Sequence, residues 1–155
     1  MSVVSLVSTA GGLDDAFDRA MELAGLGGVV PRGGTVLLKP NQHGGEGFTS
    51  PHVLRAGARW ALSRGAGPVW IGDGCVWALR EQQVQEYFQH TGLLDACRDT
   101  GAVPLDFHAG RFCTVEPGSP DLPATIGFSE YVYAADVVIN LPLMKTHFNT
   151  LVTLG

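Results

Sequence analysis

The sequence predicts an α/β fold: a mainly parallel sheet with helices on both faces, in a three-layer, Rossmann-like arrangement. Three observations support this prediction. Short aliphatic and β-branched runs alternate with segments whose apolar residues recur at helical spacing. The 21 Gly and 9 Pro mark turns between these segments rather than a linker. Polar residues directly follow several of the runs, where ligands bind in parallel sheets.

The strands are expected from the apolar runs, at Val3–Val7, Thr35–Leu38, Pro68–Ile71, Val103–Phe107 and Asp136–Leu141. The fourth run contains Pro104, which cannot donate to a ladder and therefore predicts an edge or irregular strand. The fifth, with Val137, Val138 and Ile139, predicts a strong buried strand. Residues 108–130 are expected to be mostly connection.

The helices are expected from the 3.6-residue spacing, at about Leu13–Ala24, Ser50–Gly65, Leu79–His90 and Leu93–Arg98. Acidic Asp14 and Asp15 suit the first turn of the first helix, where the helix dipole favours negative charge. Ser50 and Pro51 are typical of an N-cap and the first helical position. Strands and helices therefore alternate along the chain.

The composition limits the classes of function. With 155 residues the chain fits one domain, 1–155, which can bury about 70% of its unfolded surface. A net charge of −5 without a Lys/Arg cluster predicts no nucleic-acid partner. The sequence shows neither a membrane span nor a positively charged leader. Cys75, Cys97 and Cys113 contain no C-x-x-C pair, so we expect a reducing, cytoplasmic location.

The two lysines, Lys39 and Lys145, each follow a predicted strand, whereas eight arginines supply the other positive charges. A lysine ammonium is compact and its pKa can fall when it is desolvated, which suits a base, a Schiff-base amine or an anion clamp. Solvent-facing lysines are the alternative. Asn41 lies two residues after Lys39, so both side chains are expected on one side. Asp73, between two glycines after a strand, either faces a ligand or stabilises a turn.

Lys145 and His147 are also two residues apart, so an extended segment would present an amine and an imidazole side by side, with Thr146 facing away. The alternative for His147 is a loop anchor that bonds to backbone. We expect Asn140 and Thr146 to join Lys39 and Asn41 as ligand-binding residues.

Other candidate patterns are weak. The histidines His43, His52, His108 and His147 form no i,i+4 pair, so no metal site is predicted. Cys75 is either a nucleophile or a buried structural cysteine. The Gly44–Gly47 loop would cradle a phosphate or serve as a flexible connection, and it matches neither phosphate-binding glycine motif.

Five segments in order carry a family resemblance: Leu37-Leu38-Lys39-Pro40-Asn41, Thr49-Ser50-Pro51, Ile71-Gly72-Asp73, Thr91-Gly92-Leu93, and Asp136–Pro142 followed by Lys145-Thr146-His147. With them the chain resembles the prokaryotic domain-of-unknown-function family 362 (DUF362) over nearly its whole length. The resemblance implies no defined activity. Many members carry a ferredoxin-like iron–sulfur segment, but this chain lacks the cysteines for such a cluster.

Members of the family usually continue past the Lys-Thr-His segment into a second half. The resemblance therefore implies that 1–155 is the N-terminal part of a longer family domain, or that a partner chain completes it. A sheet ending in Val138-Ile139 would expose an apolar edge, which predicts a homo- or hetero-oligomer. Leu143 replaces a lysine common in the family, which would weaken an anion clamp there.

The leading hypothesis is an enzyme that acts on an anionic or carbonyl small molecule at the carboxyl ends of the parallel strands. Lys145 and His147 would perform acid–base chemistry, and Asp73 would hold a lysine or the substrate. Lys39 and Asn41 would stabilise developing negative charge. A redox-linked reaction would need a partner that supplies the metal. The alternative is a non-catalytic subunit that binds a ligand or completes a partner's fold.

Overall fold

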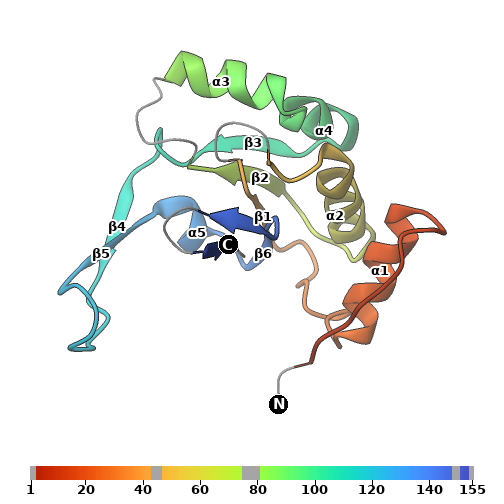
Figure 1. Ribbon diagram of the computed structural model, residues 1–155, viewed down its shortest axis with the longest axis horizontal. Helices are drawn as coiled ribbons and strands as arrows, with labels where there is room; N and C mark the ends of the chain where they lie inside the picture. Colours follow the sequence, from red (N-terminus) through yellow and green to blue (C-terminus); the bar gives the residue numbers. More distant parts are fainter. Residues whose placement is uncertain (1–2, 43–46, 75–80, 148–150, 154–155) are drawn as a thin grey trace.

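The computed structural model describes residues 3–42, 47–74, 81–147 and 151–153, and it confirms the predicted α/β fold. Four parallel strands form the main sheet in the order β3-β2-β1-β6 (Figure 1). Their bounds are β1 Val36–Pro40, β2 Val69–Asp73, β3 Val103–Asp106 and β6 Val137–Leu141. The carboxyl ends of the four strands therefore lie along one edge of the sheet. β3 is a terminal strand, as Pro104 predicts.

The described helices are α1 Leu13–Leu23, α2 Pro51–Ser63, α3 Glu81–His90, α4 Leu93–Thr100 and α5 Glu130–Ala134. Ser50 is the N-cap of α2, and its hydroxyl accepts the His52 amide N–H at 3.3 Å, with Pro51 in the first turn as predicted. α2 packs against α1, α4, β1 and β2, so it lies at the centre of one helical layer (Figure 1).

The main core lies between the sheet and this helical layer. Val36, Leu38 and Ile71 are fully buried in one cluster with Leu54 of α2. A Cβ at Gly57 would lie 3.2 Å from Leu38 Cδ1, so the missing side chain allows α2 to approach β1 closely. Apolar burial stabilises a fold by about 25 cal/mol per Å², so these buried contacts help to hold α2 on the sheet.

The opposite face of the sheet is covered less completely. Trp70 points away from the helical layer, because its neighbours Val69 and Ile71 point into it. Its ring packs edge-on against Tyr131 of α5, with centroids 6.2 Å apart, and Phe107 also contacts Tyr131. Helices thus lie on both faces, but the second face holds the five-residue α5.

The expected strand at Val3–Val7 is wrong. Its residues pair with no strand in the described ranges, and Val4 and Leu6 are more than nine-tenths exposed. Ser5 Oγ donates to the Ala20 carbonyl at 2.8 Å, so the segment lies beside α1 instead. Apolar character alone does not make a strand, since its backbone groups need a neighbouring strand.

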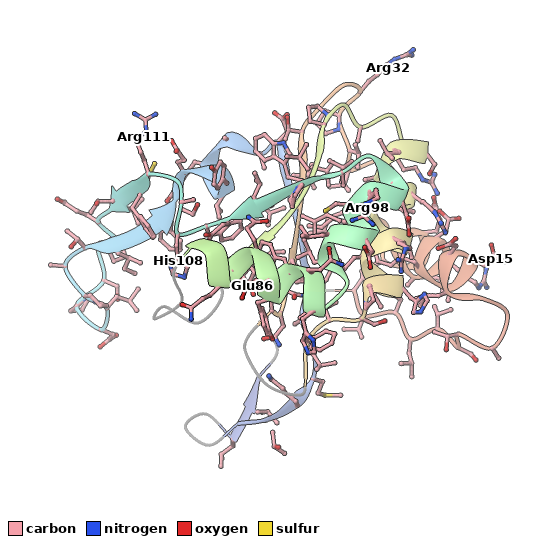
Figure 2. All side chains as sticks on the ribbon, turned by 90° about the horizontal axis from the view of Figure 1, so that it is seen from above. Asp15, Arg32, Glu86, Arg98, His108 and Arg111 are labelled. Atoms are coloured by element: carbon pink, nitrogen blue, oxygen red, sulfur yellow. The ribbon has the colours of Figure 1, made fainter. Side chains whose placement is uncertain are left out.

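Residues 108–130 are mostly connection, as expected, but they also contain an unpredicted antiparallel hairpin, β4 Phe112–Val115 and β5 Ile126–Ser129, which reaches away from the sheet (Figure 1). Arg111 closes its base: the Glu130 amide donates to the Arg111 carbonyl at 2.8 Å, and the Arg111 amide donates to Glu130 Oε1 at 2.9 Å. The bond from the Arg111 amide to the Glu130 carboxylate lowers the pKa of Glu130. Arg111 lies at the outer side of the molecule (Figure 2).

The second hairpin follows the sheet and joins β7 Lys145–His147 to β8 Leu151–Thr153. It confirms that the Lys-Thr-His segment is extended. β6, which precedes it, is not the fully buried strand expected. Val138 is 43% exposed, because β6 pairs with β1 alone among the described strands.

Within the described ranges, no helix is both long enough and apolar enough to cross a bilayer.

Candidate functional site

The polar cluster at the carboxyl edge of the sheet starts from Lys39 and Asp73. Lys39 is the fourth residue of β1 and Asp73 is the last residue of β2, and their charged atoms Nζ and Oδ1 lie 3.1 Å apart. Lys39 Nζ also donates to the Pro40 carbonyl at 3.2 Å. An ammonium has three N–H groups, so one remains for a ligand, and 36% of the Lys39 side chain is exposed.

Asp73 is held in place by backbone donors as well as by Lys39. Its Oδ2 accepts the Gln42 amide N–H at 2.7 Å, and its Oδ1 accepts that of Gly74 at 3.0 Å. The carboxylate is 8% exposed, and such charge-assisted bonds offset the cost of its burial. Asp73 therefore stabilises the end of β2 and orients the Lys39 ammonium, as the turn alternative predicts, and its role toward a ligand stays a prediction.

Asn41 and Lys145 meet on one carbonyl oxygen. Asn41 Nδ2 donates to the Gly47 carbonyl at 2.8 Å, and Lys145 Nζ donates to the same oxygen at 3.0 Å. Gly47 has φ +121°, and a Cβ there would lie 3.3 Å from Lys145 Cδ. A side chain at position 47 would therefore crowd the lysine. The structure thus joins the sequence-predicted Asn41 and Lys145, 104 positions apart in the chain, at Gly47.

Thr49 fixes the end of β1 to the end of β6. Its hydroxyl accepts the Asn41 amide N–H at 2.9 Å and donates to the Leu141 carbonyl at 2.7 Å. Its own amide donates to the Asn41 carbonyl at 2.9 Å. With the side chain 3% exposed, these bonds are shielded from water and hold Asn41 in a fixed position.

The other predicted residues are not brought into these contacts. Asn140 is exposed on β6, in register with Lys39 on β1. Thr146 is exposed on β7, opposite Val152. The backbone of His147 pairs with Leu151, but its side chain lies outside the described part of the structure. Its role beside Lys145 stays a prediction.

Sequence reasoning missed three residues at this edge: Asp106, Gln42 and Thr49. Asp106 ends β3, is in register with Asp73, and is 8% exposed; its Oδ1 accepts the His108 amide N–H at 2.9 Å. A polar residue at a strand end was the signal that identified Asp73, and it applies equally to Asp106. Thr49 appeared only within a segment of the family resemblance, and Gln42 carried no signal.

The described residues offer few candidates for metal ligands or for a nucleophilic cysteine. Within the described residues, no group of three or more His, Cys, Asp or Glu side chains could hold a metal ion. His43, Cys75 and most of the Gly44–Gly47 loop lie outside the described ranges. Cys97 is buried in the helical layer, and burial raises the pKa of its thiol to about 12, so it is not a nucleophile. The predicted cytoplasmic location stays a prediction.

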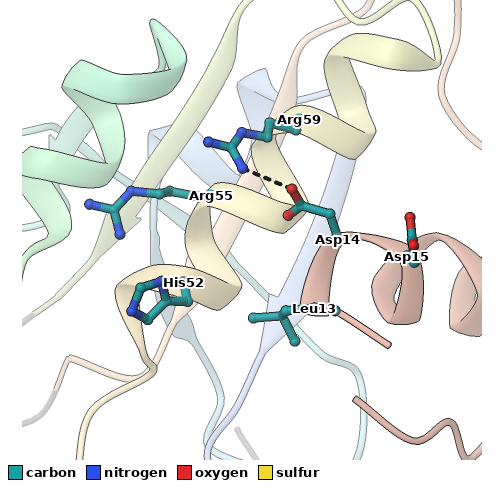
Figure 3. Close-up of a pocket in the computed structure, with 7 residues that line it drawn as sticks. Leu13, Asp14, Asp15, His52, Arg55 and Arg59 are labelled. Atoms are coloured by element: carbon teal, nitrogen blue, oxygen red, sulfur yellow. Dashed lines mark hydrogen bonds and ion pairs between the residues drawn. The ribbon is translucent and has the colours of Figure 1, made fainter. Parts of the chain in front are cut away.

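A cleft of about 300 Å³ lies elsewhere, between α1 and α2 (Figure 3). His52, Arg55 and Arg59 line it from α2, and Asp14 faces them from α1. Arg59 pairs with Asp14 at 2.8 Å, and Arg55 pairs with Asp99 at 2.6 Å. Carboxylates already neutralise both guanidinium groups, which reduces the attraction of this cleft for anions.

The polar cluster at the carboxyl edge lies within the part of the chain that matches a known protein family. Residues 36–155, which span β1 to β8, match the family described as Domain of unknown function (DUF362). Among curated proteins, the chain is similar to Thylakoid-associated protein sll1697 of Synechocystis sp., with 30% identity over 138 residues. The match covers 86% of this chain but 40% of that protein, so the chain spans about two fifths of the relative's length. No solved structure matches.

Proposed function

Since the chain belongs to the DUF362 family, a family named for its unknown function, we propose an activity from the site itself: acid–base catalysis on a small anionic or carbonyl substrate. The observation that carries the proposal is the pair of anchored lysines. Lys39 is held by Asp73 at 3.1 Å, and Lys145 is held by the Gly47 carbonyl at 3.0 Å. Preorganised ammonium groups stabilise a developing oxyanion without reorganising at the moment of reaction.

The roles follow from the chemistry of each group. Lys39 and Asn41 bind the substrate carboxylate or carbonyl oxygen, and Asp73 keeps Lys39 oriented. His147 takes a proton from the carbon next to the carbonyl, because imidazole is the side chain that most often acts as a general base. Lys145 donates a proton to the oxygen of the resulting enolate, and solvent restores both groups.

Hydrogen–deuterium exchange on pyruvate tests this proposal, since pyruvate carries both a carbonyl and a carboxylate. Proton NMR in D₂O follows the loss of the methyl signal. We expect the wild-type protein to accelerate exchange, and Lys145→Ala and His147→Ala each to reduce the rate by about 100-fold, the lower range for acid–base groups. Lys39→Ala should weaken pyruvate binding instead.

Arg98→Ala is the matched control, because Arg98 is an exposed cation on α4 with a side chain 69% accessible. It should leave the exchange rate unchanged. Circular dichroism should confirm that every variant is folded. Exchange no faster than in buffer, or a Lys145→Ala protein as active as wild type, would contradict the proposal.

A second candidate function, a subunit that completes an assembly, is favoured by the free edge of β6. A groove of about 300 Å³ follows this edge and is lined by Met21, Leu26, Val29 and the consecutive residues 137–140. Two β6 strands related by a twofold axis would pair antiparallel and cover it. We therefore favour a second copy of the chain as the occupant.

Native mass spectrometry tests this assembly. We expect a species at twice 16.4 kDa, which Val138→Lys should convert to monomer, since an added charge beside a free edge opposes strand pairing. Thr114→Lys on the β4–β5 hairpin, which is also exposed, is the control and should leave the dimer intact. A wild-type protein that is monomeric at micromolar concentration would exclude the second-copy model.

A further inference from the structure

The side chain of Gln42 has an unusual position at the carboxyl edge of the sheet. It is fully buried, yet among the residues that the structure describes neither Oε1 nor Nε2 has a hydrogen-bond partner. Leaving a buried amide unpaired costs about 1–3 kcal/mol per group, so native proteins rarely do it without a functional reason. An unpaired donor and acceptor on one buried side chain indicate a missing partner.

Gln42 also belongs physically to the lysine site. Its backbone amide donates to Asp73 Oδ2 at 2.7 Å, and Asp73 Oδ1 lies 3.1 Å from Lys39 Nζ. The preceding residue, Asn41, is fixed by Thr49 and bonds to Gly47 beside Lys145. The backbone of Gln42 is therefore tied to Asp73, which holds Lys39, and follows directly on Asn41, which shares the Gly47 carbonyl with Lys145.

We propose that Gln42 selects the substrate, by pairing its amide with a cis-amide edge of a small anionic ligand. Nε2 donates to the ligand carbonyl, and a ligand N–H donates to Oε1, as in a carboxamide or a lactam. The ligand's carboxylate binds Lys39 or Lys145. This inference rests on the proposed function of the site and defines the class of its substrate.

The chemistry of Gln42 explains why a second carboxylate is a poorer match. A carboxylate accepts hydrogen bonds but donates none, so it satisfies Nε2 and leaves Oε1 facing another oxygen. A carboxamide of nearly the same shape satisfies both atoms. Because Gln42 is enclosed, a ligand must displace the atoms that cover it, and the amide pair then forms away from water, where it discriminates strongly.

The test compares succinamate with succinate, which differ by one amide in place of one carboxylate. Both are titrated into the ¹⁵N-labelled full chain and followed by NMR. We expect succinamate to bind about tenfold more tightly than succinate, the gain from completing a pair of neutral hydrogen bonds. The side-chain amide signals of Gln42 should shift with succinamate. In Gln42→Met, which keeps the volume, the two affinities should become equal.

The outcomes separate this inference from the proposed function. If succinate binds, and Lys39→Ala weakens it, but succinamate gains nothing, the amide selection is wrong and the lysine site stands. A water-to-Gln42 NOE that persists in the succinamate complex would also overturn the inference, because a buried water is then the partner. If neither compound binds, the amide selection is wrong, and the pyruvate exchange rate still decides the proposed function. The affinity ratio and the signal shift are measured on wild type, so they hold even where Gln42→Met does not fold.

Discussion

β1 and β6 are neighbouring strands of equal length, yet their side chains are exposed to solvent to very different extents. Val36, Leu37 and Leu38 of β1 are fully buried, whereas the residues of β6 alternate between half-buried and exposed up to Leu141. The two sequences are similarly apolar. The difference comes from position: β1 has a strand on each side and α2 above it, while β6 pairs with β1 alone among the described strands. Burial is therefore set by the neighbours of a strand.

The comparison extends to the candidate site. Lys39 on β1 and Asn140 on β6 are register partners, yet Lys39 is tied to Asp73 while Asn140 is exposed. The central strand thus presents a polar group held by an ion pair, whereas the terminal strand presents a solvent-exposed one. Fixed groups suit binding and catalysis, and exposed apolar edges suit assembly.

The largest expected contrast comes from truncating one apolar residue on each strand. Leu38→Ala should lower the free energy of unfolding by about 3 kcal/mol, because it leaves a cavity in the buried cluster with Leu54. Val138→Ala should cost less than about 1 kcal/mol, because Val138 is already 43% exposed. Urea unfolding of both variants measures the contrast. Equal losses would mean that β6 is covered in solution.

The second prediction concerns the spacing between the backbones of β2 and β3. A Cβ at Gly72 of β2 would lie 2.4 Å from the Leu105 carbonyl oxygen, which cannot move aside. Gly72→Ala should therefore cost about 1–3 kcal/mol. Gly28→Ala is the control, because nothing lies within 4 Å of a Cβ there. A thermal melt that shows no difference between the variants would contradict the spacing of β2 and β3.

Cysteine chemistry provides the third contrast. Burial raises the pKa of Cys97 to about 12 from 9.0, so its thiolate fraction at pH 8 should be roughly a thousandfold lower than that of an ordinary thiol. In a Cys75→Ser background, a disulfide reagent should label Cys113 and spare Cys97 in the folded protein. Rapid labelling of both would show that the helical layer opens.

The same pKa shift predicts a pH effect on stability. The folded pKa lies above the unfolded one, so the contribution of the Cys97 thiol is complete below pH 9 and is lost as pH rises toward 12. Between pH 8 and 10.5, the urea midpoint of wild type should fall more steeply than that of Cys97→Ala. Parallel slopes would contradict the burial of the thiol.

The smallest effect is expected at the cleft between α1 and α2. Arg59 and Asp14 form an ion pair there, but both side chains are more than half exposed. Exposed pairs contribute about 0–1 kcal/mol, so Arg59→Ala should shift the melting temperature only slightly, and added salt should remove the difference. A large loss would mean that the cleft is closed by a partner.

Most of the fold could be predicted from the sequence, because its signals are local. Helical spacing predicted α1, and Ser50-Pro51 predicted the start of α2. The wrong or missed elements are those that depend on which segments lie side by side in the folded chain. Val3–Val7 has strand composition but no strand beside it, and the β4–β5 hairpin was hidden because its connection contains three prolines, which indicate a loop.

The candidate site was predictable only in part. The strand-end rule identified Lys39 and Asp73, and their contact follows from the adjacent positions of β1 and β2. The meeting of Asn41 and Lys145 on Gly47 could not be predicted, because it depends on where a loop and a distant hairpin come to lie. Gln42 was missed because an unpaired buried atom is visible only when its surroundings are known.

Thr49 connects the candidate site to β6. Its hydroxyl accepts the Asn41 amide N–H and donates to the Leu141 carbonyl, so it links the end of β1 to the end of β6. If the proposed substrate binds at Asn41, we expect the two bonds of the Thr49 hydroxyl to couple that binding to the position of the carboxyl end of β6.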